Sequence, residues 1–145
     1  VFQAFNLENS QTALENVMMP LIFAGVKKSE RKKRALEALD MVGLKDFYNH
    51  KPNEMSGGQR QRVSIARALV NKPEILFADE PTGNLDSKTS QDVLELIQST
   101  SRKFEQSVVM ITHNEHIADL AERIVRIEDG KFLKIGVGED EKTRG

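Results

Sequence analysis

The feature that most constrains the fold is a pair of short apolar runs, each followed directly by polar residues. Ile75–Ala78 leads into Asp79 and Glu80, and the run Val108–Thr112 leads into His113. Continuous apolar runs of this length are too short for a buried helix and are typical of strands covered on both faces, as in parallel sheets. The sequence therefore predicts two buried strands, each with polar side chains at its carboxyl end.

Helical patterns precede and separate these runs. The predicted helices cover residues 13–24, 29–42 and 57–69, and a fourth begins at Asp86 or Ser87. The first and third open with the capping boxes T-x-x-E and S-x-x-Q, which satisfy main-chain N–H groups at a helix start. We expect Pro20 to kink or end the first helix, because proline lacks the N–H donor that a helix needs. Gly43 suits the end of the second.

The C-terminal part continues the alternation of helix and strand. We expect a short helix over His116–Arg123, a strand over Ile124–Ile127, a hairpin turn at Asp129-Gly130 and a returning strand over Phe132–Ile135. This alternation predicts an α/β fold with a parallel sheet. The almost entirely helical N-terminal part predicts a helical subdomain over about 5–70, followed by a core portion over about 71–135 and a flexible tail over 136–145.

Composition excludes several classes of protein. The chain of 145 residues has no cysteine, which excludes a disulfide scaffold, a thiolate metal site and a cysteine nucleophile. Its 21 Lys and Arg residues nearly balance its 22 Asp and Glu residues, whereas nucleic-acid-binding domains usually carry a basic excess. No apolar run approaches the roughly 20 residues of a membrane span. Val1-Phe2 resembles the end of a buried strand, so we expect a fragment of a longer domain.

The segment Ser56-Gly57-Gly58-Gln59 is a candidate anion-binding site. A serine cap followed by two glycines exposes the first N–H groups of a helix, and the helix dipole favours negative charge there. An ordinary helix start is the alternative interpretation of these four residues taken alone. Whether this segment is an anion-binding site or an ordinary helix start depends on the other motifs in the chain.

Asp79 and Glu80 are candidate catalytic residues, because ligands bind beyond the carboxyl ends of strands in open α/β sheets. An aspartate there can hold Mg²⁺, and a second carboxylate can orient or deprotonate an attacking water. His113 follows the next strand and is expected at the same edge of the sheet. Taken singly, the carboxylates can also cap a turn, and the histidine can be a hydrogen-bonded structural residue. Gln3 alone means little.

Together, these residues resemble the nucleotide-binding domain of ATP-binding cassette (ABC) transporters over nearly the whole chain. The matching motifs are the Q-loop glutamine Gln3, the signature motif Met55–Arg62, the Walker B strand Ile75–Glu80, the D-loop Gly83–Asp86 and the switch histidine His113. Residues 5–7, 12–17 and 78–86 are similar to the branch that serves lipoprotein release, macrolide and peptide export, and cell division. The resemblance implies a P-loop NTPase-like parallel sheet, here incomplete, with an α-helical subdomain, and ATP and Mg²⁺ as cofactors.

The resemblance also implies roles for individual residues, in a dimer of two such domains that holds two ATP molecules head to tail. Ser56 and the N–H groups of Gly57 and Gly58 would bind the γ-phosphate of the ATP held by the partner domain, and Gln59 is counted with them among the nucleotide-binding residues. Asp79 would hold Mg²⁺, with Gln3 as a further ligand or water contact.

Three further residues have implied roles in hydrolysis. Glu80 would be the general base for the attacking water, and His113 would contact the γ-phosphate. Asp86 would link the two sites across the dimer and is counted among the nucleotide-binding residues.

The function implied is that of an ATP-hydrolysing motor subunit of a membrane exporter of the lipoprotein, peptide or drug type. A membrane permease would dock on the helical subdomain and hold the protein at the cytoplasmic face of the membrane, with no nucleic-acid partner. One alternative is a catalytically inactive remnant that only binds a permease or a partner ATPase domain. A non-transport ABC ATPase is disfavoured, because only 53 residues separate Gln3 from Ser56, with no heptad repeat for a long coiled coil.

One family motif does not occur in the sequence. The phosphate-binding loop G-x-x-x-x-G-K-[ST], known as Walker A, is not found among the 145 residues, and the one Gly-Lys pair, Gly130-Lys131, is followed by Phe132. Its main-chain N–H groups and lysine normally hold the β- and γ-phosphates. We therefore expect the isolated chain to be inactive as an ATPase.

Overall fold

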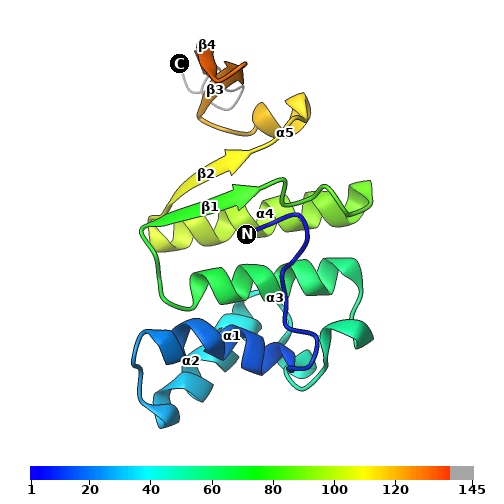
Figure 1. Cartoon of the computed structure of the whole chain (residues 1–145), viewed down its shortest axis with the longest axis vertical. Helices are drawn as coiled ribbons and strands as arrows, with labels where there is room; N and C mark the ends of the chain where they lie inside the picture. The colour runs from blue at the N-terminus through cyan, green and yellow to red at the C-terminus, as the bar shows by residue number, and fades with distance from the viewer. Residues whose placement is uncertain (138–145) are drawn as a thin grey trace. The chain divides into compact units, whose positions relative to one another are not determined.

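The computed structural model describes residues 1–137, which form two compact units that divide after Val109 (Figure 1). The first unit contains four helices and one complete strand: α1 (Ala13–Phe23), α2 (Lys28–Met41), α3 (Gly57–Leu69), β1 (Ile75–Asp79) and α4 (Ser87–Phe104). Short 3-10 turns at Lys45–Phe47 and Pro52–Glu54 join α2 to α3. β2 (Ser107–Ile111) crosses the division, and the second unit continues with α5 (Glu115–Ala118), β3 (Arg123–Glu128) and β4 (Lys131–Val137).

The predicted helical subdomain corresponds to α1, α2 and α3, which pack on one another (Figure 1). Its core is formed by fully buried aliphatic side chains from all three helices, among them Val17, Leu21, Leu39, Val63 and Ile65. Complete burial of each such side chain contributes roughly 1.5–3 kcal/mol. Both predicted capping boxes are confirmed, at the start of α1 and at the start of α3. Helices thus form at the three places in this part of the chain where the sequence predicts them.

Of the two outcomes predicted for Pro20, the end of the first helix is wrong, because α1 continues to Phe23, and a kink at Pro20 stays a prediction. Proline costs one hydrogen bond within a helix, but α1 packs against both α2 and α3, and this packing outweighs a local defect. α2 ends at Met41 with Val42 as its C-cap, and Gly43, the expected cap, follows with a φ of +73°, the left-handed conformation that glycine adopts without strain. The N–H of Leu44 then donates to the carbonyl of Leu39 at 2.8 Å, which closes the helix end.

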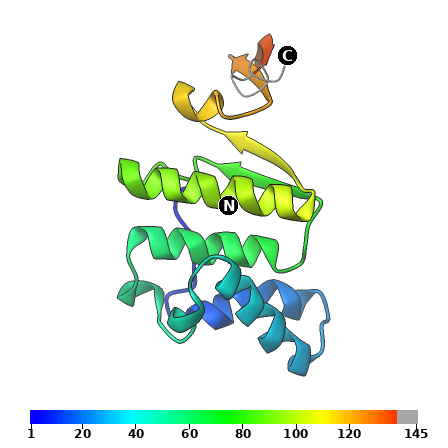
Figure 2. The ribbon, with the colours of Figure 1, turned by 180° about the vertical axis from the view of Figure 1, so that it is seen from behind.

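β1 and β2 form a two-stranded sheet, and α4 lies along one side of β1 (Figures 1 and 2). At the other edge of β1, the main chain of Val1 bonds to Phe77 and Asp79, and Phe2 forms a parallel bridge with Asp79. This N-terminal segment therefore pairs with β1 as the end of a strand would, but it is not buried. Phe2 itself is 52% exposed rather than buried.

The prediction that both apolar strands are buried on both faces is wrong. Leu76 and Ala78 of β1 are buried, but Ile75 is 50% and Phe77 62% exposed. β2 is likewise only partly covered, with Val109 44% exposed. The physical reason is that within Val1–Val109 the helices lie on one side of β1, so that one face of this strand meets no packing layer.

The loop after Gln3 is held in an unusual conformation by α3. Phe5 and Asn6 both have positive φ, 56° and 49°, a conformation that costs non-glycine residues roughly 1–2 kcal/mol. The guanidinium of Arg67 donates to both carbonyls, at 3.0 Å to Phe5 and 2.7 Å to Asn6. Arg60 lies over the Phe5 ring, with its guanidinium carbon 5.0 Å from the ring centre. Two arginines of α3 therefore stabilise the strained loop.

Replacing Arg67 by methionine, which keeps an unbranched apolar stem but removes both donors, should lower the free energy of unfolding by about 1.5–3 kcal/mol. Hydrogen bonds from a charged, half-buried donor are worth more than bonds at the surface, and burial lowers the pKa of Arg67 without neutralising it at neutral pH. Urea unfolding followed by circular dichroism measures the change. Arg102→Met, on an exposed part of α4, is the matched control and should be nearly neutral. Equal effects of the two substitutions would contradict the role given to Arg67.

The second unit contains an antiparallel hairpin of β3 and β4. The predicted turn at Asp129-Gly130 is confirmed, with both residues at positive φ and Glu128 paired with Lys131. The predicted helix over His116–Arg123 is wrong in extent, since α5 covers only Glu115–Ala118. Asn114 caps it, which starts the helix earlier than expected. The predicted tail over 136–145 begins within β4, and its remainder lies outside the described residues.

In the part of the chain that the structure describes, no helix is both long and apolar enough to cross a membrane.

Candidate functional site

The N-terminus of α3 has the geometry of an anion-binding site. The hydroxyl of Ser56 accepts from the N–H of Gln59 at 3.2 Å, and the Gln59 side chain accepts from the N–H of Ser56 at 2.9 Å. No acceptor among the described residues meets the N–H groups of Gly57 and Gly58. Because a hydroxyl that accepts one bond still has a proton to donate, Ser56 and the two glycines present three donors at the positive end of the helix.

The structure also shows which of the four predicted signature residues can meet a ligand. Ser56 is exposed, and Gly57 and Gly58 are partly exposed. The carbonyl oxygen of the Gln59 side chain is occupied by the capping box, so Gln59 acts here mainly by orienting Ser56. Its part in nucleotide binding stays a prediction.

The glycines allow the start of α3 to lie directly against the start of α4. A Cβ atom at Gly58 would stand 2.5 Å from Cγ2 of Thr89, closer than atoms of this kind approach. A Cβ atom at Gly57 would meet Cδ2 of Leu85 at 3.4 Å, an ordinary contact. Gly58 is therefore required by packing as well as by access to its N–H.

Gly58→Ala should destabilise the chain by about 1–3 kcal/mol, because the added methyl group clashes with a short side chain that cannot turn away. Thr89 is fixed by its own hydrogen bonds to Asp86. Thermal unfolding measures the loss, and Gly57→Ala is the matched control with little expected effect. Combining Gly58→Ala with Thr89→Ser removes the clashing methyl group and should restore stability. Failure of this rescue would show that the clash is not the cause.

Asp86 is the N-cap of α4, and it is one of the two residues, Asp86 and Ser87, at which the sequence predicted this helix to begin. Its carboxylate accepts from the N–H of Thr89 at 3.1 Å and from the Thr89 hydroxyl at 2.6 Å. These hydrogen bonds lower the pKa of Asp86, so the carboxylate stays charged well below neutral pH. Its contribution to the cap is present at neutral pH and is lost only as the pH falls through this lowered pKa. The predicted role of Asp86 in linking two sites across a dimer stays a prediction.

Gln3 packs against the turn that follows β1. Its side-chain amide lies 3.4 Å from the Asn84 side-chain oxygen, and the Asn84 amide donates to the carbonyl of Gln3 at 2.9 Å. A Cβ atom at Gly83 would stand 2.5 Å from the Gln3 amide nitrogen, so a larger residue there would displace the Gln3 side chain. The structure thus brings Gln3 together with the predicted D-loop, Gly83–Asp86.

Asp79 and Glu80 lie at the carboxyl end of β1, as predicted. Asp79 is exposed, and Glu80 is partly exposed with a positive φ of 42°. Backbone strain of this kind at the end of a strand is common at functional sites, where it aims a side chain. Among the described residues no three His, Asp or Glu side chains converge to hold a metal ion. The predicted role of Asp79 in holding Mg²⁺ stays a prediction.

His113 follows β2, as predicted, and is exposed. It belongs to the second unit, whereas Asp79 and Glu80 belong to the first. Its expected position at the same sheet edge stays a prediction.

Sequence reasoning missed Gln61, which connects the signature helix to two other segments. Its side chain is completely buried, and its amide donates to the carbonyls of Pro81, just after Glu80, and of Phe2, just before Gln3. The sequence contains a pattern that could have identified Gln61, because Gln61, Ile65 and Leu69 recur at a spacing of four on the buried face of α3. A polar residue in an apolar stripe is expected to have a buried partner.

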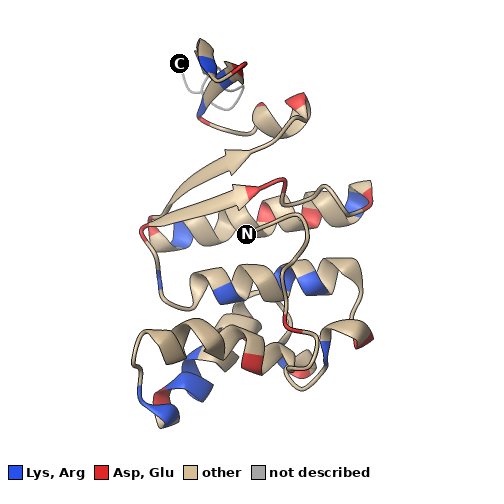
Figure 3. Cartoon of the chain, viewed as in Figure 1, with Lys and Arg blue, Asp and Glu red and all other residues tan. Residues whose placement is uncertain are grey.

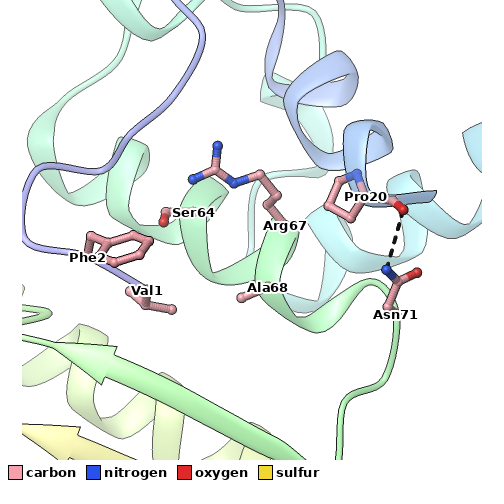
Figure 4. A pocket seen from close by; sticks show the side chains of 7 residues that line it. All are labelled: Val1, Phe2, Pro20, Ser64, Arg67, Ala68 and Asn71. Atoms are coloured by element: carbon pink, nitrogen blue, oxygen red, sulfur yellow. Dashed lines mark hydrogen bonds between the residues drawn. The ribbon is translucent and has the colours of Figure 1, made fainter. Parts of the chain in front are cut away.

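A pocket of about 310 Å³ lies between the N-terminal segment and the second half of α3 (Figure 4). It is lined by Val1, Phe2, Pro20, Ser64, Arg67, Ala68 and Asn71. None of the predicted nucleotide-binding residues lines it. The candidate anion-binding end of α3 instead lies at the exposed surface of the chain.

Comparison with known proteins agrees with this geometry. The ABC transporter family matches residues 1–83. The chain is 53% identical over 133 residues to the lipoprotein-releasing system ATP-binding protein LolD of Geobacter metallireducens. The aligned region covers 92% of the chain and 59% of LolD. It is 48% identical to the macrolide export ATP-binding/permease protein MacB of Aggregatibacter actinomycetemcomitans, over 92% of the chain and 20% of MacB.

A solved structure matches as well. The ATP-binding cassette MJ0796 of Methanocaldococcus jannaschii, a dimer in a post-hydrolysis state bound to ADP and Pi, superposes with a TM-score of 0.81 at 48% identity. The match covers 94% of the chain and 61% of the cassette, so the chain spans less than two thirds of these relatives. The chain belongs to the ABC transporter family. The predicted P-loop NTPase-like fold class and the lipoprotein-release and macrolide-export branch are both confirmed.

Proposed function

We propose that the chain is part of the ATP-hydrolysing motor subunit of an ABC-type membrane exporter of the lipoprotein, peptide or drug type. The observation that carries the proposal is the N-terminus of α3, where Ser56, Gly57 and Gly58 present three unpaired donors on an open surface. Such a surface suits a phosphate that another domain holds. The names of the relatives LolD and MacB support the transport assignment.

The residues of this chain fit ATP and Mg²⁺ in part. The donors of α3 suit a γ-phosphate, and Asp79 supplies one carboxylate to a Mg²⁺ ion, which typically takes one or two carboxylates and completes its shell with phosphates and water. Mg²⁺ supplies charge neutralisation on the phosphates when it is bound. Glu80 would accept a proton from the attacking water, and Gln3 would orient that water or the metal.

Two partners follow from this proposal. A second ABC domain would complete each site in a head-to-tail dimer, so that Ser56 of one domain faces the nucleotide of the other. The dimeric state of MJ0796 supports this arrangement. A membrane permease would dock on the lobe of α1, α2 and α3 and would keep the protein at the inner face of the membrane.

The isolated chain tests the phosphate site directly. Because no G-x-x-x-x-G-K-[ST] loop occurs in the 145 residues, we expect no ATPase activity and an affinity for Mg-ATP no tighter than about millimolar. A nitrogen-15 NMR titration should nevertheless shift the amide signals of Gly57 and Gly58. The turn glycines Gly25 and Gly130 serve as controls and should not move. Unmoved signals at Gly57 and Gly58 would contradict the proposed site, and micromolar affinity would mean that other residues hold the phosphates.

A further inference from the structure

The free end of the helical lobe combines exposed apolar side chains with a dense cluster of basic residues. Phe23, at the end of α1, is 84% exposed, more than any other large apolar side chain described, and Ile22 beside it is 49% exposed. After a short turn, residues 27–34 hold six of the chain's 21 Lys and Arg residues and one acidic residue, Glu30. Figure 3 shows this basic segment at the end of the lobe where α1 turns into α2.

The turn between the two helices is ordered and keeps these groups close together. The N–H of Gly25 donates to the carbonyl of Ile22 at 3.1 Å, and the N–H of Val26 donates to that of Leu21 at 3.0 Å. The connection from Phe23 to the start of α2 therefore stays folded on the end of α1. We use the name lysine patch for six exposed residues on either side of this turn: Ile22, Phe23, Lys27, Lys28, Lys32 and Lys33.

The arginines and lysines of this segment are used differently. Arg31 donates to the carbonyl of Val26, and Arg34 donates to the carbonyl of Val70 at 3.0 Å. The four lysines are exposed, and no acidic side chain among the described residues pairs with them. The arginines thus stabilise the lobe, while the lysines remain available to an external partner.

This arrangement is unfavourable for the helix itself. α2 is capped by Lys27, which makes no side-chain hydrogen bond to the helix start, whereas Thr12, Ser56 and Asp86 cap the other long helices. Positive charge at a helix N-terminus opposes the helix dipole. The start of α2 is therefore basic and has no side-chain cap, and an exposed phenylalanine lies at the end of the preceding helix.

We propose that the lysine patch binds the anionic phospholipid surface of a membrane. Lysine is depleted at protein–protein interfaces, where arginine is enriched, and here the arginines face inward. Hydrated, flexible ammonium groups suit mobile phosphate headgroups, and an exposed aromatic side chain can insert at the boundary between headgroups and acyl chains. The contact is separate from the proposed ATPase function, because it involves neither nucleotide nor a second domain.

Vesicle flotation tests the proposal with the full chain, and self-associated protein stays at the bottom of the gradient. Vesicles with about one-third phosphatidylglycerol should bind the chain at least about tenfold better than pure phosphatidylcholine vesicles, and added salt should weaken the binding. Replacing Lys27, Lys28, Lys32 and Lys33 together by glutamine should abolish the preference. Phe23→Ser should weaken binding about fivefold while the dependence on anionic lipid remains.

A variant of equal charge provides the control. Replacing Lys45, Lys72, Lys88 and Lys103 by glutamine removes the same charge from other exposed positions of the first unit and should leave binding nearly unchanged. Circular dichroism verifies that each variant is folded. The proposal is overturned if the chain shows no preference for anionic vesicles, or if both quadruple variants lose binding equally. Neither outcome bears on ATP hydrolysis, which this assay does not involve.

Discussion

Replacing Glu80 by glutamine should slow ATP hydrolysis by roughly 10²–10⁴-fold and leave ATP binding intact, in a protein that joins this chain to a Walker A loop. Glutamine keeps the shape of glutamate but cannot accept a proton from the attacking water. Glu80 is the expected base because it directly follows Asp79 at the carboxyl end of β1, with a positive φ of 42°. Steady-state turnover and nucleotide affinity are measured separately.

The matched control is Glu74→Gln, the same chemical change just before the opposite end of β1. Glu74 is exposed, and its main-chain carbonyl accepts from the N–H of Ser107 whatever the side chain is. Turnover should therefore remain near that of the parent. If Glu80→Gln also kept turnover within about threefold, Glu80 could not be the general base.

Replacing Ser56 by arginine should abolish hydrolysis while the affinity of a single domain for ATP is unchanged, because the signature serine serves the nucleotide of the partner domain. The bulky cation would occupy the space in front of the Gly57 and Gly58 N–H groups. Arginine also removes the cap of α3, which costs about 1 kcal/mol. Ser56→Asp separates the two effects, because aspartate caps a helix as well as serine does but repels a phosphate. Both variants should be inactive, and only the arginine variant should lose stability.

A mixed dimer tests which of the two nucleotide sites each substitution disables. One domain carries Ser56→Arg, and the other carries a defective Walker A loop. In the head-to-tail arrangement these two lesions fall on the same composite site, and the second site keeps all its parts. Loss of both sites, or survival of both, regardless of which domain carries each lesion, would contradict this arrangement. Single-turnover hydrolysis distinguishes one competent site per dimer from none.

The parts of the fold that could be predicted from the sequence are those that depend on neighbouring residues. The S-x-x-Q box at Ser56 marks the start of α3 because both of its hydrogen bonds form within one turn. The exposure of Phe77 could not be predicted, because an apolar strand does not specify how many layers cover it. Likewise, Pro20 marks a local weakness in α1, but the packing that outweighs it comes from α2 and α3.

In the candidate site, too, some residues could be predicted from the sequence and others could not. The motif residues Ser56, Gly58 and Glu80 could be singled out from their types and order, because phosphate binding and proton transfer need these groups. The contact of Thr89 with Gly58 could not be predicted, because it joins two different helices, α3 and α4. Arg67 was also missed, since its acceptors are main-chain carbonyls that leave no mark in the sequence.

Hydrogen bonds to main-chain carbonyls affect how this protein can change over evolutionary time. The long polar side chains that join its segments donate to main-chain carbonyls, as in the bonds of Arg34 to Val70, Arg62 to Val42, Gln61 to Pro81 and Gln106 to Pro73. A carbonyl is present whatever side chain its residue carries, so an accepting position can vary without losing the bond. The donating position has no such freedom. We therefore expect amino-acid substitutions to accumulate at the accepting positions, in loops and at helix ends, while a small set of donating arginines and glutamines stays unchanged.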